Sequence, residues 1–168
     1  AASDVYKRQV SNSFSKNLSL YGERVGGLSV VCKDEAQAKA VQGQLQFNIR
    51  RIYSSPPSHG GHVVDIVMND EALFNEWVQE VYVMRDRIKE MRQKLRDSLE
   101  AKLPGRSFEY ITKQNGMFSY TGLTPEQVAR IIKDFGIYMV ANGRISVAGL
   151  NASNIDYVAN AMAEVLKD

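Results

Sequence analysis

One lysine stands among hydroxyl side chains near the start of the chain, within residues 11–27. Lys16 follows Ser13 and Ser15, and Arg24 comes eight residues later, just before a Gly-Gly step. A lysine amine can form a Schiff base with an aldehyde, while hydroxyls and a guanidinium bind phosphate. Pyridoxal phosphate carries both groups, so this segment has side chains suited to both of its ends. The alternative on composition alone is a solvated lysine in a serine-rich loop.

Three further blocks follow: residues 49–60 (IRRIYSSPPSHG), 114–123 (QNGMFSYTGL) and 141–151 (ANGRISVAGLN). With Ser-Asn-Ser-Phe-Ser-Lys-Asn and Leu-Tyr-Gly-Glu-Arg-Val-Gly-Gly of the first segment, they resemble class I aminotransferases of the aspartate and aromatic amino-acid branch. The resemblance covers residues 11–168. It implies an α/β chain that is the C-terminal part of a fold-type I pyridoxal-phosphate enzyme, namely the end of the large domain plus the small C-terminal α+β domain.

The resemblance also implies roles for the residues of the first segment. Lys16 matches the lysine that holds pyridoxal 5'-phosphate and then moves a proton between the substrate's α-carbon and the cofactor. Ser13 and Arg24 match phosphate ligands, and Ser15 is a further hydroxyl donor. Without the motif, a surface ion pair between Arg24 and Glu23 would be the alternative.

Two substrate residues follow from the later blocks. Arg144 matches the arginine that pairs with the substrate's α-carboxylate, where a planar fork fixes orientation better than a lysine. Phe118 matches a residue lining the substrate cleft. The alternatives are a solvated arginine at a strand edge and simple core packing.

Arg50 matches an arginine that reaches the neighbouring active site in a homodimer and pairs with the second carboxylate of a dicarboxylic substrate. Aspartate-specific members commonly carry Asn where Ser55 stands here. Together with residues 119–121, Ser55 favours the aromatic branch. The resemblance then implies transamination of tyrosine and phenylalanine, and also of aspartate, with 2-oxoglutarate as the amino acceptor. An aspartate-specific enzyme is the alternative.

The bulk properties exclude several other classes. The 168 residues are 44% hydrophobic and 24% charged, with a net charge of +2, so no basic field for nucleic acid is present. No apolar run approaches the roughly 20 residues of a membrane span. Cys32 cannot form an internal disulfide and is expected to be a buried thiol, which fits a cytoplasmic protein. His59 and His62 alone are weak evidence for a metal, and none is expected.

The resembled enzymes are more than twice as long as this chain, and their contacts to the cofactor ring lie upstream of its start. A non-catalytic fragment is therefore the alternative to an enzyme for the chain as given. Residues 1–10 do not resemble the family's apolar strand, and we expect a non-native leader there. We expect residues 11–83 to end the large domain and residues 84–168 to form the small one.

Patterning predicts the elements that position these residues. A helix is expected from an Asp34 cap to about residue 52, before Pro56-Pro57, with a turn at 59–62. A long helix is expected at 70–102, with an apolar stripe and a solvated basic face that includes Arg92. A further helix runs from Thr124 to Gly136, and a last one starts at Ser153. Strands are expected at 27–32, 108–112, 116–121, 137–140 and 144–147.

Overall fold

The computed structural model describes residues 9–167 and divides the chain into two compact units, Ala1–Val81 and Tyr82–Asp168. The expected boundary between large and small domains, at residues 83 and 84, remains a prediction about the longer enzyme. Most of the expected leader, residues 1–8, lies outside the described residues, whereas Gln9 and Val10 belong to the first strand.

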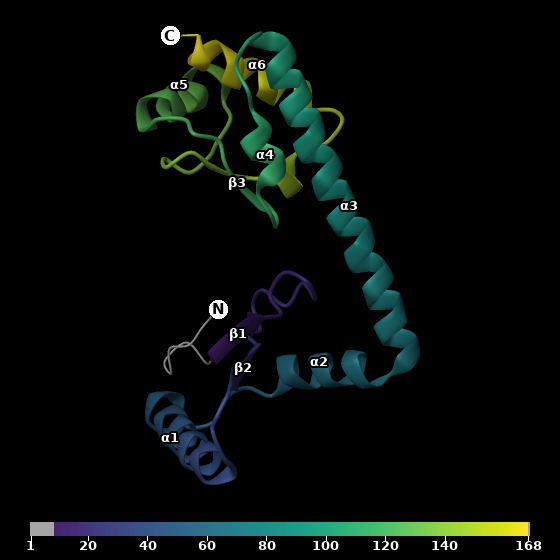
Figure 1. Cartoon of the computed structure of the whole chain (residues 1–168), viewed down its shortest axis with the longest axis vertical. Helices are drawn as coiled ribbons and strands as arrows, with labels where there is room; N and C mark the ends of the chain where they lie inside the picture. Colours follow the sequence, from purple (N-terminus) through teal and green to yellow (C-terminus); the bar gives the residue numbers. More distant parts are fainter. Residues whose placement is uncertain (1–8, 168) are drawn as a thin grey trace. The chain divides into compact units, whose positions relative to one another are not determined.

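The first unit begins with a β-hairpin (Figure 1). Strand β1 (Gln9–Ser13) pairs antiparallel with β2 (Gly26–Val30), so that Ser13 lies opposite Gly26. The expected strand at 27–32 is confirmed in place, but the expectation that it is buried is wrong. Leu28 is 50% exposed and Val31 65%. In the described residues this sheet has only two strands, so no further strand pairs with the outer edge of β2.

Helix α1 (Glu35–Tyr53) begins where the sequence predicts. Asp34 Oδ1 accepts a hydrogen bond from the Gln37 amide at 2.7 Å, and Gln37 Oε1 accepts from the Lys33 amide at 2.8 Å. These two bonds satisfy backbone donors around the helix start. The helix ends at Tyr53 with Ser54 as its C-cap, two residues before Pro56.

The turn expected at residues 59–62 is wrong, because helix α2 (His59–Asn69) starts there. Two adjacent glycines suggested a turn. The amide of His62 nevertheless bonds back to the carbonyl of Ser58 at 2.9 Å and closes a helical turn. Gly60 is buried, which shows that a glycine here serves close packing rather than chain reversal.

Helix α3 (Glu71–Lys102) confirms the long helix. Its apolar stripe is buried in the C-terminal part, at Met91, Leu95 and Leu99, while Leu73 and Met84 are about two-fifths exposed. The expectation that Arg92 lies on a solvated face is wrong, since its side chain is only 3% exposed. Arg92 stands four residues after Ile88 and three before Leu95, so it falls on the apolar side of the helix.

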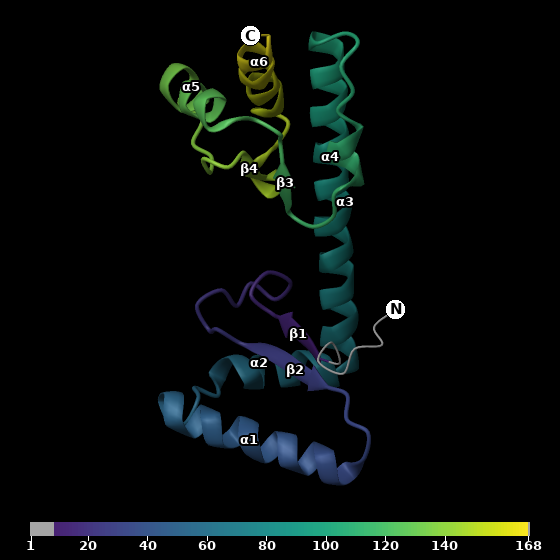
Figure 2. The same cartoon turned by 60° about the vertical axis from the view of Figure 1, so that its left-hand side comes forward.

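The second unit contains a small sheet and four short helical segments besides α3 (Figure 2). Strand β3 (Phe118–Tyr120) pairs antiparallel with β4 (Arg144–Ser146), and the 3₁₀ turn η2 (Val147–Gly149) follows β4. The helices are α4 (Glu109–Lys113), α5 (Pro125–Phe135) and α6 (Ile155–Leu166). The expected strands at 116–121 and 144–147 and the expected last helix are thereby confirmed.

Helix α5 carries the expected end signals. Thr124 Oγ1 accepts from the Gln127 amide at 3.3 Å, and Gln127 Oε1 accepts from the Thr124 amide at 3.0 Å, which is a reciprocal capping box. Gly136 ends the helix at a φ of 63°. This left-handed conformation favours glycine.

Two expected strands are absent from the described residues. Residues 108–112 form the start of α4 instead, and the burial of both Phe108 and Ile111 matches a helical step of three. Residues 137–140 do alternate, with Ile137 and Met139 half-buried and Tyr138 and Val140 exposed. They have no hydrogen-bonded partner strand among the described residues, since the sheet there contains only β3 and β4.

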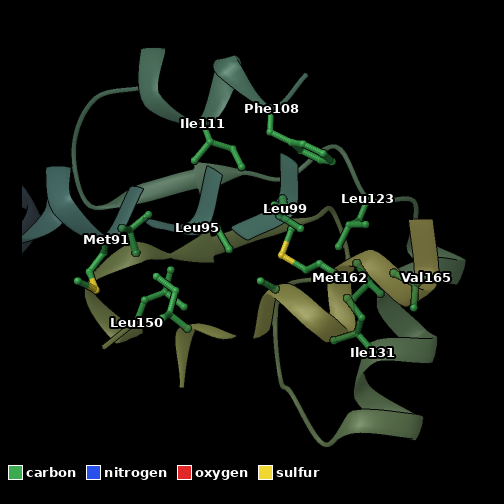
Figure 3. Packing of buried hydrophobic residues seen from close by; sticks show 14 residues of the cluster. Met91, Leu95, Leu99, Phe108, Ile111, Leu123, Ile131, Leu150, Met162 and Val165 are labelled. Atoms are coloured by element: carbon green, nitrogen blue, oxygen red, sulfur yellow. The ribbon is translucent and has the colours of Figure 1, made fainter. Parts of the chain in front are cut away.

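The hydrophobic core of the second unit joins α3 to α4, α5, η2 and α6 (Figure 3). Leu95 and Leu99 of α3 are fully buried, as are Ile111 of α4 and Val165 of α6. In residues 9–167 no helix combines the length and the apolar character needed to cross a membrane.

Leu95→Ala should lower the free energy of unfolding of the second unit by about 2–5 kcal/mol, because it leaves a cavity in a fully buried position. Val83→Ala is the matched control on the same helix, since Val83 is 65% exposed, and should change that free energy by less than about 0.5 kcal/mol. Urea unfolding followed by circular dichroism measures both. Equal effects of the two substitutions would contradict this placement of the core.

Candidate active site

The β1–β2 hairpin carries four of the predicted site residues. Its ends are held by the strand register and by a hydrogen bond from the Phe14 amide to the Val25 carbonyl at 3.2 Å. Ser13 Oγ lies 3.0 Å from Ser15 Oγ and accepts from the Ser15 amide at 3.2 Å. Ser15 is 6% exposed, whereas Ser13 is exposed. The two hydroxyls therefore form one polar pair at the base of the loop.

Lys16 is the second residue of the turn at 15–18, and its side chain is exposed. Its ammonium group lies 6.0 Å from the centre of the Tyr21 ring. The next residue fixes the loop to α3, because Trp77 Nε1 donates to the Asn17 carbonyl at 2.8 Å. The side-chain oxygen of Asn17 is buried and has no hydrogen-bond partner within residues 9–167.

Arg24 lies on the returning arm of the same loop with a φ of 53°, a conformation that is uncommon for a residue with a side chain. Its Nη1 donates to the Tyr21 carbonyl at 3.1 Å. Helix α2 supports this arm through Gly60, where an added Cβ would lie 2.8 Å from Glu23 Cβ and 3.1 Å from Val25 Cγ1. The glycine thus allows the helix to lie against the residues on either side of Arg24.

These side chains fit a ligand that bears an aldehyde and a phosphate. The hairpin brings an amine, two hydroxyls and a guanidinium onto one short loop, and the residue after Lys16, Asn17, has a buried side-chain oxygen without a partner in residues 9–167. A guanidinium has five N–H donors, so its bond to Tyr21 leaves capacity for an anion. Strained backbone such as that at Arg24 is concentrated at binding sites in general.

The second group of predicted residues lies on β3 and β4. The guanidinium carbon of Arg144 lies 4.9 Å from the centre of the Phe118 ring, a cation–π contact. Arg144 is directly opposite Tyr120 in the strand register, and its amide donates to Asn142 Oδ1 at 3.1 Å. The structure therefore brings Phe118 and Arg144 together, on a sheet that leaves both exposed.

The turn before Arg144 is held tightly. The carbonyl of Gly143 accepts from the Thr121 amide at 3.0 Å and from Thr121 Oγ1 at 2.8 Å. The Tyr110 hydroxyl donates to the Thr121 carbonyl. Burial raises the pKa of Tyr110, so its phenol keeps the proton that this bond requires. The chain beside Arg144 is thus fixed from two sides.

Arg50 belongs to neither group. It lies exposed in the last turn of α1, ahead of the C-cap residue Ser54. His59 and His62 are both on α2. Within residues 9–167, no three His, Cys, Asp or Glu side chains lie together as a metal site would need. Cys32, expected to be buried, is half-buried and free.

Sequence reasoning missed the residues that support these two groups. Trp77 lies in the long helix expected at 70–102, and Arg92 is expected on the solvated face of that helix. Gln114 is the first residue of the block 114–123. The sequence predicts a supporting role for none of the three. The spacing of Arg92 relative to Ile88 and Leu95 is a signal that could have found it, because it places a cation on the buried side of α3.

Comparisons with known proteins identify the family of this chain. The model of the family described as aminotransferase class I and II matches residues 2–162. The chain therefore belongs to the class I and II aminotransferase family. The aromatic-amino-acid aminotransferase of Escherichia coli K12 is 55% identical over 157 residues, which are 94% of this chain and 40% of that protein. The mitochondrial aspartate aminotransferase of Arabidopsis thaliana is 52% identical over 158 residues, 94% of this chain and 37% of that protein.

Solved structures show the same fold. The psychrophilic aromatic amino acid aminotransferase of Psychrobacter sp. B6, crystallised with aspartic acid, is 71% identical with a TM-score of 0.91, over 95% of this chain and 40% of that one. The aromatic-amino-acid aminotransferase of Burkholderia pseudomallei, covalently bound to pyridoxal phosphate, is 52% identical with a TM-score of 0.89, over 94% and 40%. The resemblance seen in the sequence is thereby confirmed, as is the α/β fold. The chain spans about 40% of the length of the aromatic aminotransferases it matches.

Gly143→Ala should destabilise the second unit by about 1–2 kcal/mol and displace Arg144. Gly143 has a φ of 80°, and an added Cβ would lie 2.9 Å from the Leu123 carbonyl oxygen. Gly149→Ala is the control, because nothing lies within 4 Å of a Cβ there and its φ is not positive. Thermal unfolding of both variants measures the difference, and a Gly143→Ala variant as stable as Gly149→Ala would refute it.

Proposed function

We propose that the protein containing this chain transaminates aromatic amino acids, chiefly tyrosine and phenylalanine, and also aspartate, with 2-oxoglutarate as amino acceptor. The observation that carries this proposal is the 71% identity to an aromatic amino acid aminotransferase across 95% of the chain. The presence of Lys16, Ser13 and Arg24 on one hairpin supports it, because these are the groups that the chemistry needs.

In this proposal pyridoxal 5'-phosphate supplies an aldehyde that takes up the amino group and a ring that accepts electrons from the α-carbon. Lys16 would hold the cofactor through its amine. The same amine would act as the base that moves the proton at the α-carbon. Ser13, Ser15 and Arg24 bind the phosphate, with Arg24 acting as a fork and the hydroxyls as single donors.

Arg144 binds the α-carboxylate that every amino acid and 2-oxo acid substrate carries. Phe118 lies against its guanidinium and limits the directions in which that fork can point. Arg50 binds the second carboxylate of aspartate or 2-oxoglutarate in the neighbouring subunit of a homodimer. Ser55 in place of Asn favours the aromatic branch over an aspartate-specific enzyme.

Borohydride treatment of the full-length enzyme should fix pyridoxal phosphate covalently on Lys16, and Lys16→Ala should remove that label. Peptide mapping by mass spectrometry locates the modified residue. Lys33→Ala, on the exposed segment after β2, is the control and should keep the label. A label found on another lysine of the unaltered enzyme would overturn the assignment of Lys16.

Arg144→Ala should lower kcat/KM for aspartate and for phenylalanine alike, whereas Arg50→Ala should lower it for aspartate and leave phenylalanine nearly unchanged. Loss of a charge-assisted pair costs about ten- to hundredfold in kcat/KM. Steady-state kinetics of both variants with both substrates measure this. An enzyme that accepts aspartate and rejects phenylalanine would instead be aspartate-specific.

A mixed dimer of Lys16→Ala and Arg50→Ala chains tests the crossing of Arg50. One of its two sites would have neither residue and the other would have both. It should keep about half of the activity toward dicarboxylates if Arg50 acts on the neighbouring site. If Arg50 acts on its own subunit's site, every site lacks one of the two residues and dicarboxylate activity is largely lost.

A further inference from the structure

The buried guanidinium of Arg92 is placed against the strand that carries Phe118. Its Nη1 donates to the Ile111 carbonyl at 2.7 Å and to Ser119 Oγ at 3.2 Å. Its Nη2 donates to the carbonyls of Gly116 at 2.8 Å and Phe118 at 2.6 Å. All four acceptors are neutral oxygens. This arrangement differs from a salt bridge, in which a carboxylate would balance the charge.

A cation in this position is costly, because burial removes its hydration. That burial lowers the pKa of Arg92. An apolar side chain would continue the stripe formed by Met91 and Leu95 at less cost. The four oxygens explain the arginine, since they need donors that an apolar side chain does not have.

The strand geometry shows why those oxygens need donors. Along β3, successive carbonyls point to opposite edges. The Met117 carbonyl accepts from the Val147 amide at 2.8 Å, toward β4 and η2. The carbonyls of Gly116 and Phe118 therefore point to the outer edge, where the described residues provide no further strand. Arg92 supplies the donors that a third strand would give.

Gln114 completes this outer edge. Its Nε2 donates to the Tyr120 carbonyl at 3.0 Å, and its Oε1 accepts from the Tyr120 amide at 2.8 Å, as a neighbouring strand would. The Ser119 hydroxyl donates to the same Oε1 at 2.9 Å and accepts from Arg92. Arg92, Ser119 and Gln114 thus form one connected network along β3.

The inner edge of β3 leads to Arg144. Tyr120 is paired with Arg144 in the register, and the Phe118 ring lies 4.9 Å from the Arg144 guanidinium. A shift of β3 would carry the Phe118 ring with it and change the face on which Arg144 rests. The outer edge therefore controls the orientation of the guanidinium on the inner edge.

We propose that Arg92, together with Gln114, is a positioning residue for carboxylate binding: these two side chains replace a third strand on β3 and hold Phe118 so that Arg144 presents its fork to the substrate. This inference rests on the proposed role of Arg144. The proposed effect is on the affinity for aromatic and dicarboxylic substrates alike, because Arg144 binds the α-carboxylate of both. Proton transfer is not affected.

The test uses the full-length enzyme loaded with pyridoxal phosphate and the probe 3-phenylpropanoate, which has an aromatic end and a carboxylate but no amino group. Arg92→Lys should weaken its binding about three- to tenfold, the equivalent of about one hydrogen bond. KM for phenylalanine and for aspartate should rise by a similar factor while kcat stays unchanged. Calorimetric titration measures the affinity.

Val165→Ala is the matched control for general loosening, because Val165 is fully buried on α6 and has no part in the β3 edge. It should lower Tm and leave the affinity unchanged. If Arg92→Lys binds the probe as the parent does, the proposal is wrong. It is equally wrong if Val165→Ala weakens binding as much as Arg92→Lys at a comparable loss of Tm.

Arg144→Lys separates this inference from the function on which it rests. It should weaken the probe about ten- to hundredfold, since an ammonium cannot form the two-pronged pair. An unchanged affinity for Arg144→Lys would remove the proposed role of Arg144 itself. If Arg92→Lys does not fold, Gln114→Ala replaces it, since Gln114 is half-exposed and lies outside the helices. The proposal is then wrong if Gln114→Ala binds the probe as the parent does, or if Val165→Ala weakens binding as much at a comparable loss of Tm.

Discussion

The second unit depends on how the buried positive charge of Arg92 is stabilised without a carboxylate. Arg92 leaves α3 among apolar neighbours, and its N–H groups reach three carbonyls and one hydroxyl of the segment from α4 to β3. Partial charges on several oxygens replace the full charge of one acid. Because each oxygen must be within hydrogen-bonding distance, the cation dictates the path of that segment. The hydrophobic contacts of Leu95 and Leu99 then fix α3 against the rest of the unit.

Different interactions hold the first unit together. Its hairpin is exposed on both strands, and α1 has no buried residue. Within this unit a few specific contacts hold the lysine loop. Trp77 holds the Asn17 carbonyl from α3, and Gly60 lets α2 approach Glu23 and Val25. These contacts lie next to the candidate ligands, at the residue after Lys16 and on either side of Arg24.

The sequence predicted those parts of the fold that local chemistry determines. The Asp34 cap, the Thr124–Gln127 capping box and the Gly136 end are decided within a few residues, and all are confirmed. Failures occurred where distant partners decide. The alternating residues 137–140 have no partner strand among residues 9–167, and Gly60-Gly61 lie in a helix whose Gly60 packs against Glu23 and Val25. For the candidate site, Phe118 and Arg144 lie in strands that the sequence predicted, whereas β1 of the hairpin that carries Ser13, Lys16 and Arg24 was not predicted. The burial of Arg92 was not predicted, because an arginine side chain is ordinarily solvated. Its hydrogen-bond acceptors 19 to 27 residues along the chain explain that burial.

The contact between Trp77 and the Asn17 carbonyl has an optical consequence. Trp77 is the single tryptophan of this chain. Its indole emission reports the polarity and hydrogen bonding of the loop beside Lys16, since the ring nitrogen is bonded within that loop. Tyr82–Asp168 contains tyrosines and phenylalanines but no tryptophan. With excitation at the red edge of the aromatic band, the fluorescence of this chain comes from one unit only. Unfolding of the other unit has to be followed by another signal, such as tyrosine absorbance or circular dichroism.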